Sequence, residues 1–261
     1  MGKLKQSTPS GVATRRELFR LFLREKHDPE PYYARLAERS VATFPFPLDG
    51  QRVLDLGAGD GSFGAAVRSV GGQVVAADLS VGAMTTAHQR GLPAVVCDGT
   101  RVPVHDATFD GIVCSNVLEH TPDANALFAE IERLLVPDGW AWISWTNWYS
   151  PWGGHEIVPL HYLGPKLGLR TWRRFFGEPR VNIPFEGLWP TYVGRMLGEL
   201  TRHAGLELVD AMPRYYPSQR WILRVPGLRE VATWNCLLLL RRRAGTSGPS
   251  ERPLAAAGVT S

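Results

Sequence analysis

The stretch Val53–Gly64, VLDLGAGDGSFG, combines an apolar run with a cluster of glycines. Its first residues suit a strand that is covered on both faces. The glycines at 57, 59 and 61 permit backbone angles, and a close approach of a ligand, that a Cβ would forbid. The following GSFGAAVRSVGG has the pattern of a helix ended by glycine. The stretch therefore predicts a strand, a tight turn and a helix, with bare backbone open to a nucleotide-like ligand.

The residues between the glycines distinguish two classes of ligand. A dinucleotide fingerprint, G-x-G-x-x-G, needs its third glycine at the position of Ser62, whereas here that glycine comes one residue earlier. The turn also carries Asp60, and Asp55 lies just upstream. Carboxylates there repel a pyrophosphate and attract a cationic ligand. A nicotinamide oxidoreductase is therefore the less favoured alternative.

Three further segments continue the pattern in order. Gln73–Ser80, QVVAADLS, indicates a second strand that ends in Asp78, where an acidic side chain can accept both ribose hydroxyls. AVVCDGT places Asp98 at the end of a third strand, and Thr108–His120 forms a fourth. From Gln51 to Trp145 this set resembles the class I S-adenosylmethionine-dependent methyltransferases, in particular the type 11 group and its actinobacterial members.

The resemblance implies S-adenosyl-L-methionine as the cofactor. Asp55 and residues 57–61 would hold its methionine end and Asp78 its ribose. Asp98 with Gly99 would meet its adenine, while Asn116 would line the pocket. The implied cofactor-binding residues are Asp55, Gly57, Ala58, Gly59, Asp60, Gly61, Asp78, Leu79, Asp98, Gly99 and Asn116. The pair Glu119 and His120 resembles part of an E-x-x-E-H metal motif, but Asn116 replaces its first glutamate, so we expect no metal.

The fold expected is α/β. Parallel strands joined by crossover helices make a doubly wound sheet, whose ligands lie beyond the carboxyl ends of the strands. The resemblance implies seven mostly parallel strands with an antiparallel last strand and a helical or irregular cap. Near the end, GLELVDA and Val231–Leu240, VATWNCLLLL, read as the two final strands.

A chain of 261 residues is long enough for one sizeable hydrophobic core, which predicts a single domain with additional segments around it. We expect a flexible N-terminus over 1–13, lid helices over 14–50, a cofactor-binding core over 51–146, an acceptor-recognition insertion over 147–189, the rest of the sheet over 190–243 and a flexible tail over 244–261. In the lid, Asp28 is the predicted cap of a helix starting at Pro29. The absence of a spanning or signal-like apolar run predicts a cytoplasmic protein, and the cysteines at 97, 114 and 236 are expected to be buried and reduced.

Charge is unevenly distributed along the chain. The formal net charge is +3 over residues 1–50, −6 over 51–146 and +7 over 147–261. The acidic part suits a sulfonium cofactor, and the basic remainder suits an anionic acceptor or surface. Arginine-rich faces that contact only solvent are the alternative interpretation.

The insertion supplies the candidate catalytic residues, His155, Glu156 and His161, of which the two histidines rank first as general bases. A carboxylate acceptor would need no base. The prolines and the tandem Gly153 and Gly154 predict irregular structure over the sheet edge. Within it, PKLGLRTWRRFFG indicates a basic amphipathic helix, which fits a weak peripheral contact with an anionic membrane or an ordinary surface helix.

We therefore expect methyl transfer to a small-molecule or lipid-linked acceptor, anionic in character, at oxygen. The alternatives are an RNA methyltransferase, since basic charge also follows a phosphate backbone, and a catalytically silent cofactor-binding subunit. No DNA partner is expected. The oligomeric state does not follow from the sequence.

Overall fold

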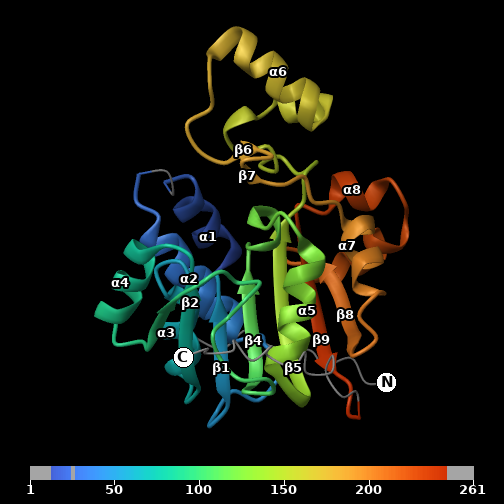
Figure 1. The fold of residues 1–261 in the computed structure, drawn as a ribbon. Helices are drawn as coiled ribbons and strands as arrows, with labels where there is room; N and C mark the ends of the chain where they lie inside the picture. The colour runs from blue at the N-terminus through green and yellow to red at the C-terminus, as the bar shows by residue number, and fades with distance from the viewer. Residues whose placement is uncertain (1–12, 25–26, 246–261) are drawn as a thin grey trace, which may run out of the picture.

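The computed structural model describes residues 13–24 and 27–245. A seven-stranded sheet forms its centre (Figure 1), in the order β3-β2-β1-β4-β5-β9-β8. Strands β1 to β5 pair in parallel, and β9 runs antiparallel to both β5 and β8. The strands are β1 Arg52–Leu56, β2 Gln73–Asp78, β3 Ala94–Val96, β4 Phe109–Ser115, β5 Leu135–Thr146, β8 Leu206–Pro213 and β9 Asn235–Arg242. The predicted α/β fold with its doubly wound, mostly parallel sheet is confirmed.

Helices cover both faces of the sheet and explain why its central strands are apolar on both sides. On one face α2, α3 and α4 pack in a cluster that includes Phe63, Trp140 and Trp142. On the other, α5 and α7 pack in a cluster that includes Phe128 and Trp145. Side chains along β5 alternate between the two clusters, as the period of two in a strand requires. The helices are α2 Glu30–Val41, α3 Ser62–Arg68, α4 Val81–Gln89, α5 Ala124–Leu134 and α7 Val193–Leu200.

The strand order reverses between β1 and β4. From β1 the chain moves outward through β2 to β3 and then returns to place β4 on the other side of β1. In open sheets of this kind, ligands bind in the crevice beyond the carboxyl ends of the strands at the reversal. The segments that follow β1, β2, β3 and β4 are therefore brought together at one edge of the sheet.

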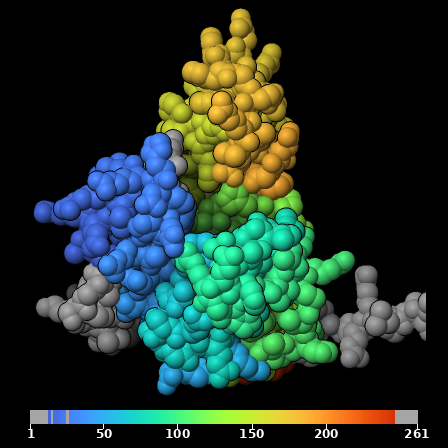
Figure 2. Space-filling view, turned by 90° about the vertical axis from the view of Figure 1, so that its left-hand side faces the viewer, coloured from blue at the N-terminus to red at the C-terminus, as the bar shows by residue number. Residues whose placement is uncertain are grey.

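Two helices precede the sheet. In α1, Arg15–Phe22, the Thr14 hydroxyl caps the helix by accepting a hydrogen bond from Glu17 N at 3.2 Å. Helix α2 begins one residue later than predicted, because Pro29 and not Asp28 occupies the cap position and no side chain caps the helix. Figure 2 shows these helices, in blue, standing beside the yellow insertion with the surface hollowed between them.

The insertion after β5 projects beyond the sheet edge (Figure 1). It contains short turns η2 His155–Ile157 and η3 Leu160–Leu163, the helix α6 Pro165–Phe176, and the two-residue strands β6 Ile183–Pro184 and β7 Gly187–Leu188. A small core of Trp148, Ile157, Leu169 and Leu188 holds these pieces together. Irregular structure around one regular helix is thus what the sequence predicted here. Trp152 connects the insertion to α1 through an edge contact with Phe22, with 4.9 Å between ring centroids.

Two sequence predictions near the C-terminus and at the sheet edge are wrong. Val231 and Ala232 lie in the short helix α8 Leu228–Ala232, not in the last strand, and β9 starts at Asn235. The Glu230 carboxylate accepts hydrogen bonds from Val193 N and Gly194 N at the start of α7, so it holds α8 away from the sheet. Between β8 and α8 lies η4, Pro217–Arg224. Cys97 is partly exposed because it follows the short edge strand β3, whereas the other two cysteines are buried.

Two further predictions concern the ends of the chain. The predicted flexible N-terminus and C-terminal tail lie almost wholly outside the described residues.

Candidate active site

The glycine turn after β1 has the backbone geometry that its sequence requires. Gly57, Gly59 and Gly61 have φ of +70°, +54° and +80°, a region that disfavours every residue with a Cβ. A Cβ on Gly57 would lie 2.2 Å from Val117 Cγ2, while one on Gly59 would meet nothing within 4 Å. Gly57 N and Ala58 N both donate to Ala77 O of β2, at 2.7 and 3.0 Å. The turn is therefore clamped between β2 and the end of β4 and is open at Gly59.

Asp78 joins the end of β2 to this turn. Its Oδ2 accepts a hydrogen bond from Gly59 N at 3.0 Å, and its Oδ1 accepts one from Ser80 N at 2.8 Å. The neighbouring Leu79 is 74% exposed. A carboxylate and an apolar side chain thus lie together beside the open glycine, a pairing that suits a ribose and a base.

The residues predicted to meet the adenine and to line the pocket lie at the next strand ends. Asp98 Oδ1 accepts hydrogen bonds from Thr100 N and Thr100 Oγ1, both at 2.8 Å, and these bonds lower the pKa of Asp98. Gly99 packs against the core, because a Cβ there would touch Leu56 and Leu127. Asn116 has φ of +57° and its Oδ1 accepts a hydrogen bond from Asn235 Nδ2 at 2.8 Å.

The two acidic residues around the turn have different surroundings. Asp60 binds Arg90 at 3.0 Å, and Arg90 also binds Glu30 of α2 at 2.9 Å. Its carboxylate therefore links the turn to α4 and α2. Asp55 is buried, with Oδ2 accepting a hydrogen bond from Gly64 N at 2.7 Å. Burial above all, together with the negative charges of Asp60 and Asp78 and against the hydrogen bond from Gly64, raises the pKa of Asp55 to about 7.

This raised pKa predicts that cofactor binding depends on pH. A cationic cofactor near Asp55 favours the carboxylate, so the pKa of Asp55 falls on binding and a proton is released. Affinity should therefore increase as the pH rises through about 7. Calorimetry with S-adenosylmethionine in two buffers of different ionisation enthalpy measures the released protons. Asp55→Asn should bind the cofactor roughly tenfold to a hundredfold more weakly, for the loss of a charge-assisted bond of about 1.5–3 kcal/mol. Proton release by that variant equal to the native value would contradict the assignment to Asp55.

The three candidate catalytic residues of the insertion do not share one environment. His161 is fully buried, and its Nε2 lies 2.9 Å from Ser150 O. Glu156 Oε2 accepts hydrogen bonds from Arg180 N and Val181 N, at 2.6 and 3.0 Å. His161 and Glu156 therefore bind backbone groups of the insertion and stabilise it. A side chain engaged in this way is poorly suited to act as a general base. Sequence spacing alone placed the three side chains together.

His155 is partly exposed, whereas His161 is fully buried. The Nδ1 of His155 lies 3.2 Å from Asn182 Nδ2, and its buried Nε2 has no hydrogen-bond partner among the described residues. The ring contacts that of His120, with centroids 5.4 Å apart. Burial of the ring and, to a smaller extent, the nearby His120 lower the pKa of His155 to about 4. The imidazole is therefore neutral near pH 7. Because the amide nitrogen of Asn182 can only donate, Nδ1 accepts this hydrogen bond and the proton of the neutral ring lies on Nε2.

Glu119 and Arg214 are charged residues at this edge whose surroundings sequence reasoning missed. Glu119 Oε1 accepts a hydrogen bond from Thr146 N at 2.9 Å, and burial raises the pKa of Glu119. Its backbone O accepts a bond from Trp189 N, and His120 Nδ1 lies 2.7 Å from Gly187 O. The pair therefore anchors the insertion to the sheet. Arg214 directly follows the end of β8. This position at a strand end is the one feature of the sequence that could have identified it as a candidate site residue.

Comparison with known proteins identifies the family. A family model described as a methyltransferase domain matches residues 54–143. A protein of Mycobacteroides abscessus described as an uncharacterized methyltransferase is 34% identical over 242 residues, covering 87% of this chain and 93% of its own. The chain belongs to the S-adenosylmethionine-dependent methyltransferases. A second methyltransferase relative, from Mycolicibacterium gilvum, is 34% identical over 89% of this chain and 96% of its own.

Solved structures agree with the fold of this methyltransferase. An S-adenosylmethionine-dependent methyltransferase from Mesorhizobium loti covers 80% of this chain and 98% of its own, at 21% identity and a TM-score of 0.52. The [4+2]-cyclase SpnF covers 81% of this chain and 82% of its own, at 20% identity and a TM-score of 0.53. At such identities the likeness concerns the fold, and one fold hosts several chemistries.

The residues at the strand ends fit the cofactor that this family uses. Gly59 offers backbone that a ligand can reach, and the carboxylates of Asp55, Asp60 and Asp78 gather around the turn. Such a concentration of negative charge suits a sulfonium and an ammonium group. The exposed Leu79 offers an apolar surface to a purine ring. Both the shape of the turn and its charge therefore match S-adenosylmethionine.

Proposed function

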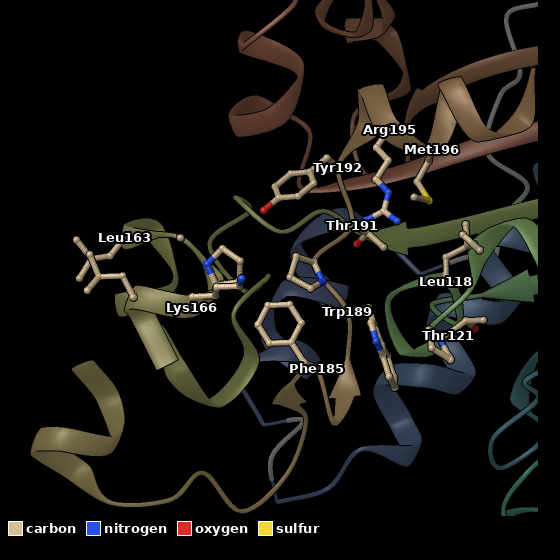
Figure 3. Close-up of a pocket in the computed structure, with 16 residues that line it drawn as sticks. Leu118, Thr121, Leu163, Lys166, Phe185, Trp189, Thr191, Tyr192, Arg195 and Met196 are labelled. Carbon is tan, nitrogen blue, oxygen red and sulfur yellow. The ribbon is translucent and has the colours of Figure 1, made fainter. Parts of the chain in front are cut away.

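We propose that this methyltransferase transfers a methyl group to an oxygen atom of a small or lipid-linked amphipathic acceptor. The observation that carries the proposal is a cavity of about 510 Å³ between η1 (Leu118–His120), the insertion and α7 (Figure 3). Its size lies in the range of small-molecule sites. It is lined mainly by apolar groups, with the basic side chains of Lys166 and Arg195. The lining includes Leu118, Thr121, Leu163, Phe185, Trp189, Tyr192 and Met196.

The position of this cavity supports an acceptor site. Leu118 and Thr121 belong to the segment η1 Leu118–His120 and its continuation, which begins two residues after Asn116 at the end of β4. The cavity therefore adjoins the strand end where the cofactor pocket is expected. An apolar lining with two basic side chains matches an acceptor that has an apolar part and an anionic group.

The chain's contribution to the reaction is positioning. S-adenosylmethionine, when bound, supplies an electrophilic methyl group on a positively charged sulfur. The glycine turn and Asp78 would hold it, while the insertion would hold the acceptor and exclude water. Alignment of two reactants contributes about 7–11 kcal/mol to lowering a barrier. A hydroxyl acceptor must also lose a proton, and we favour His155, a neutral and partly exposed imidazole, over the buried His161 as the base.

A methylation screen tests the proposal. The purified protein is incubated with methyl-labelled S-adenosylmethionine and, separately, with a lipid extract, a polar metabolite pool and bulk RNA. We expect label in a product of the lipid or metabolite fraction, lost on hydrolysis when it is an ester. Label in RNA alone would overturn the proposal in favour of an RNA methyltransferase, and no label in any fraction would favour a catalytically silent subunit.

Helix α6 supports a lipid-linked acceptor. Within residues 13–24 and 27–245 no helix is long and apolar enough to span a bilayer. At the tip of the insertion, however, Phe175 and Phe176 are 71% and 66% exposed. The basic residues Lys166, Arg170, Arg173 and Arg174 of the same helix are also exposed. Exposed aromatic rings beside basic side chains favour the interface of an anionic membrane.

This surface predicts binding to anionic vesicles. The protein should sediment with phosphatidylglycerol vesicles and much less with phosphatidylcholine vesicles. Replacing Arg170 and Arg174 by Gln should weaken the binding roughly thirtyfold, because each basic residue near such a surface contributes about 1 kcal/mol. The control is Val209→Ser, which alters an exposed apolar residue on β8. Equal sedimentation of the double variant and the control would show that α6 does not contact the membrane.

A further inference from the structure

Arg214 is a cation that joins three separate elements at the cofactor edge of the sheet. Its Nη1 donates hydrogen bonds to Ser115 Oγ and Ser144 Oγ, at 3.2 and 3.1 Å, and its Nη2 donates one to Ser40 Oγ at 3.2 Å. Ser115 and Ser144 are paired residues at the ends of β4 and β5, and Ser40 belongs to α2. The guanidinium therefore lies where the lid helix meets the sheet, one residue from Asn116.

Among the described residues no carboxylate lies within ion-pair distance of this guanidinium, although the Glu119 carboxylate is near enough to raise the pKa of Arg214. Within the part of the chain that the structure describes, the buried Nε of Arg214 has no hydrogen-bond partner. All three acceptors are neutral hydroxyls. The guanidinium stacks over the rings of Trp142 and Phe63, with 4.7 and 5.4 Å between its Cζ and the ring centroids. A cation so placed is costly without a counter-charge, and burial accordingly lowers the pKa of Arg214.

The other arginines near this edge contrast with Arg214. Arg90 binds both Asp60 and Glu30, and Arg229 binds Glu230. Their charges are compensated within the protein. Arg214 is partly accessible to solvent, and its guanidinium has no ion-pair partner among the described residues.

Aromatic residues surround the approach to Arg214. Tyr32 of α2 and Tyr215 lie close enough to Arg214 to affect its charge, and Tyr32 contacts Phe22 and Tyr33, with ring centroids 5.5 and 5.2 Å apart. Apart from Tyr215, these rings belong to the N-terminal helices. A ligand bound at the guanidinium would lie beside these rings, which would shield the ligand from water. The exclusion of water strengthens the attraction between opposite charges.

We propose that Arg214 binds a carboxylate or phosphate oxyanion of the methyl acceptor. That the oxyanion belongs to the methyl acceptor rests on the proposed function, whereas the existence of an oxyanion site at Arg214 does not depend on it. The planar fork of arginine matches either group, and the stacking on Trp142 fixes the plane of the fork. The bonds to Ser115 and Ser144 place the bound oxyanion beside the end of β4, next to the cofactor edge. Arg214 thereby selects acceptors that carry a negative charge and positions them for transfer.

The test uses the full chain saturated with S-adenosylhomocysteine. Arginine labelled with ¹⁵N allows the Nε–H resonance of Arg214 to be followed by NMR while inorganic phosphate or acetate is added. We expect a saturable shift of this resonance, assigned by its absence from Arg214→Met. Tighter phosphate binding points to a phosphate-bearing acceptor and tighter acetate binding to a carboxylate. An Arg214 resonance that does not respond to either anion, or that responds without saturation as salt alone would cause, overturns the proposal.

Two variants separate oxyanion binding from a structural role. Arg214→Lys keeps the charge and should bind phosphate weakly, whereas Arg214→Met should lose at least tenfold in affinity while retaining affinity for S-adenosylhomocysteine. The matched control is Arg52→Met, which removes an arginine paired with Asp110 at the opposite end of the strands. Phosphate binding that is unchanged in Arg214→Met would also overturn the proposal. A chain that binds phosphate at Arg214 but methylates no small molecule or lipid would contradict only the proposed function.

Discussion

Gly57→Ala should abolish cofactor binding and destabilise the fold by about 2–5 kcal/mol. Two costs add here. A residue with a Cβ in the left-handed region costs about 1–2 kcal/mol, and forcing a methyl group into a packed site costs about 1–3 kcal/mol. Gly57 has φ of +70°, and the new Cβ would lie 2.2 Å from Val117 Cγ2. The turn cannot keep its bonds to Ala77 O while making room for this atom.

Denaturant unfolding and calorimetry with S-adenosylhomocysteine measure the two effects. The control is Gly198→Ala in α7, where a Cβ would meet nothing within 4 Å and φ is not positive. That substitution should leave cofactor affinity unchanged and be neutral or slightly stabilising, because alanine favours a helix. Native affinity in Gly57→Ala would show that the turn can move without loss and that its shape is not what binds the cofactor.

Asp78→Ala should weaken S-adenosylhomocysteine binding by about a hundredfold or more. The substitution removes the acceptor of the bonds from Gly59 N and Ser80 N and also the carboxylate expected to bind the ribose. Hydrogen bonds to a charged group contribute about 1.5–3 kcal/mol each. The loss of a ribose bond, together with a loosened turn, therefore accounts for a change of at least this size.

The control for Asp78 is Asp110→Ala. Asp110 is also an aspartate of the sheet, but it lies at the start of β4 and pairs with Arg52. Its removal should leave the affinity for S-adenosylhomocysteine unchanged. Micromolar binding that survives in Asp78→Ala would contradict the assignment of the ribose site, and tight binding of NAD by the native chain would contradict the choice of cofactor.

These predictions concern the cofactor half, whereas the acceptor half depends on the insertion. The insertion is attached to the sheet through Glu119 and His120, and it reaches α1 through Trp152 and Phe22. Specificity is commonly built into segments of this kind, carried on a rigid scaffold. The cavity beside η1 and the cation at Arg214 lie on different elements, and both connect to the end of β4.

The sequence by itself determined the order of strands and helices and the identity of the cofactor turn. Both depend on local requirements, since alternation of apolar residues, glycine at positive φ and an acid at a strand end are properties of short segments. The turn at Gly57–Gly61 and the place of Asp78 could therefore be predicted in detail. The separation of Val231 from β9 could not, because it depends on Glu230 capping a helix that starts at Val193.

Only the tertiary structure decided which charged and titratable side chains are available for chemistry. His155 and His161 look alike in sequence, yet His155 is partly exposed and contacts His120, whereas His161 is fully buried against Ser150 O. Arg214 resembles many other arginines, but it binds Ser40, 174 residues away, and forms no ion pair with any described residue. Burial and partners arise from contacts between segments that are distant in the sequence. The pattern within one segment therefore cannot reveal them.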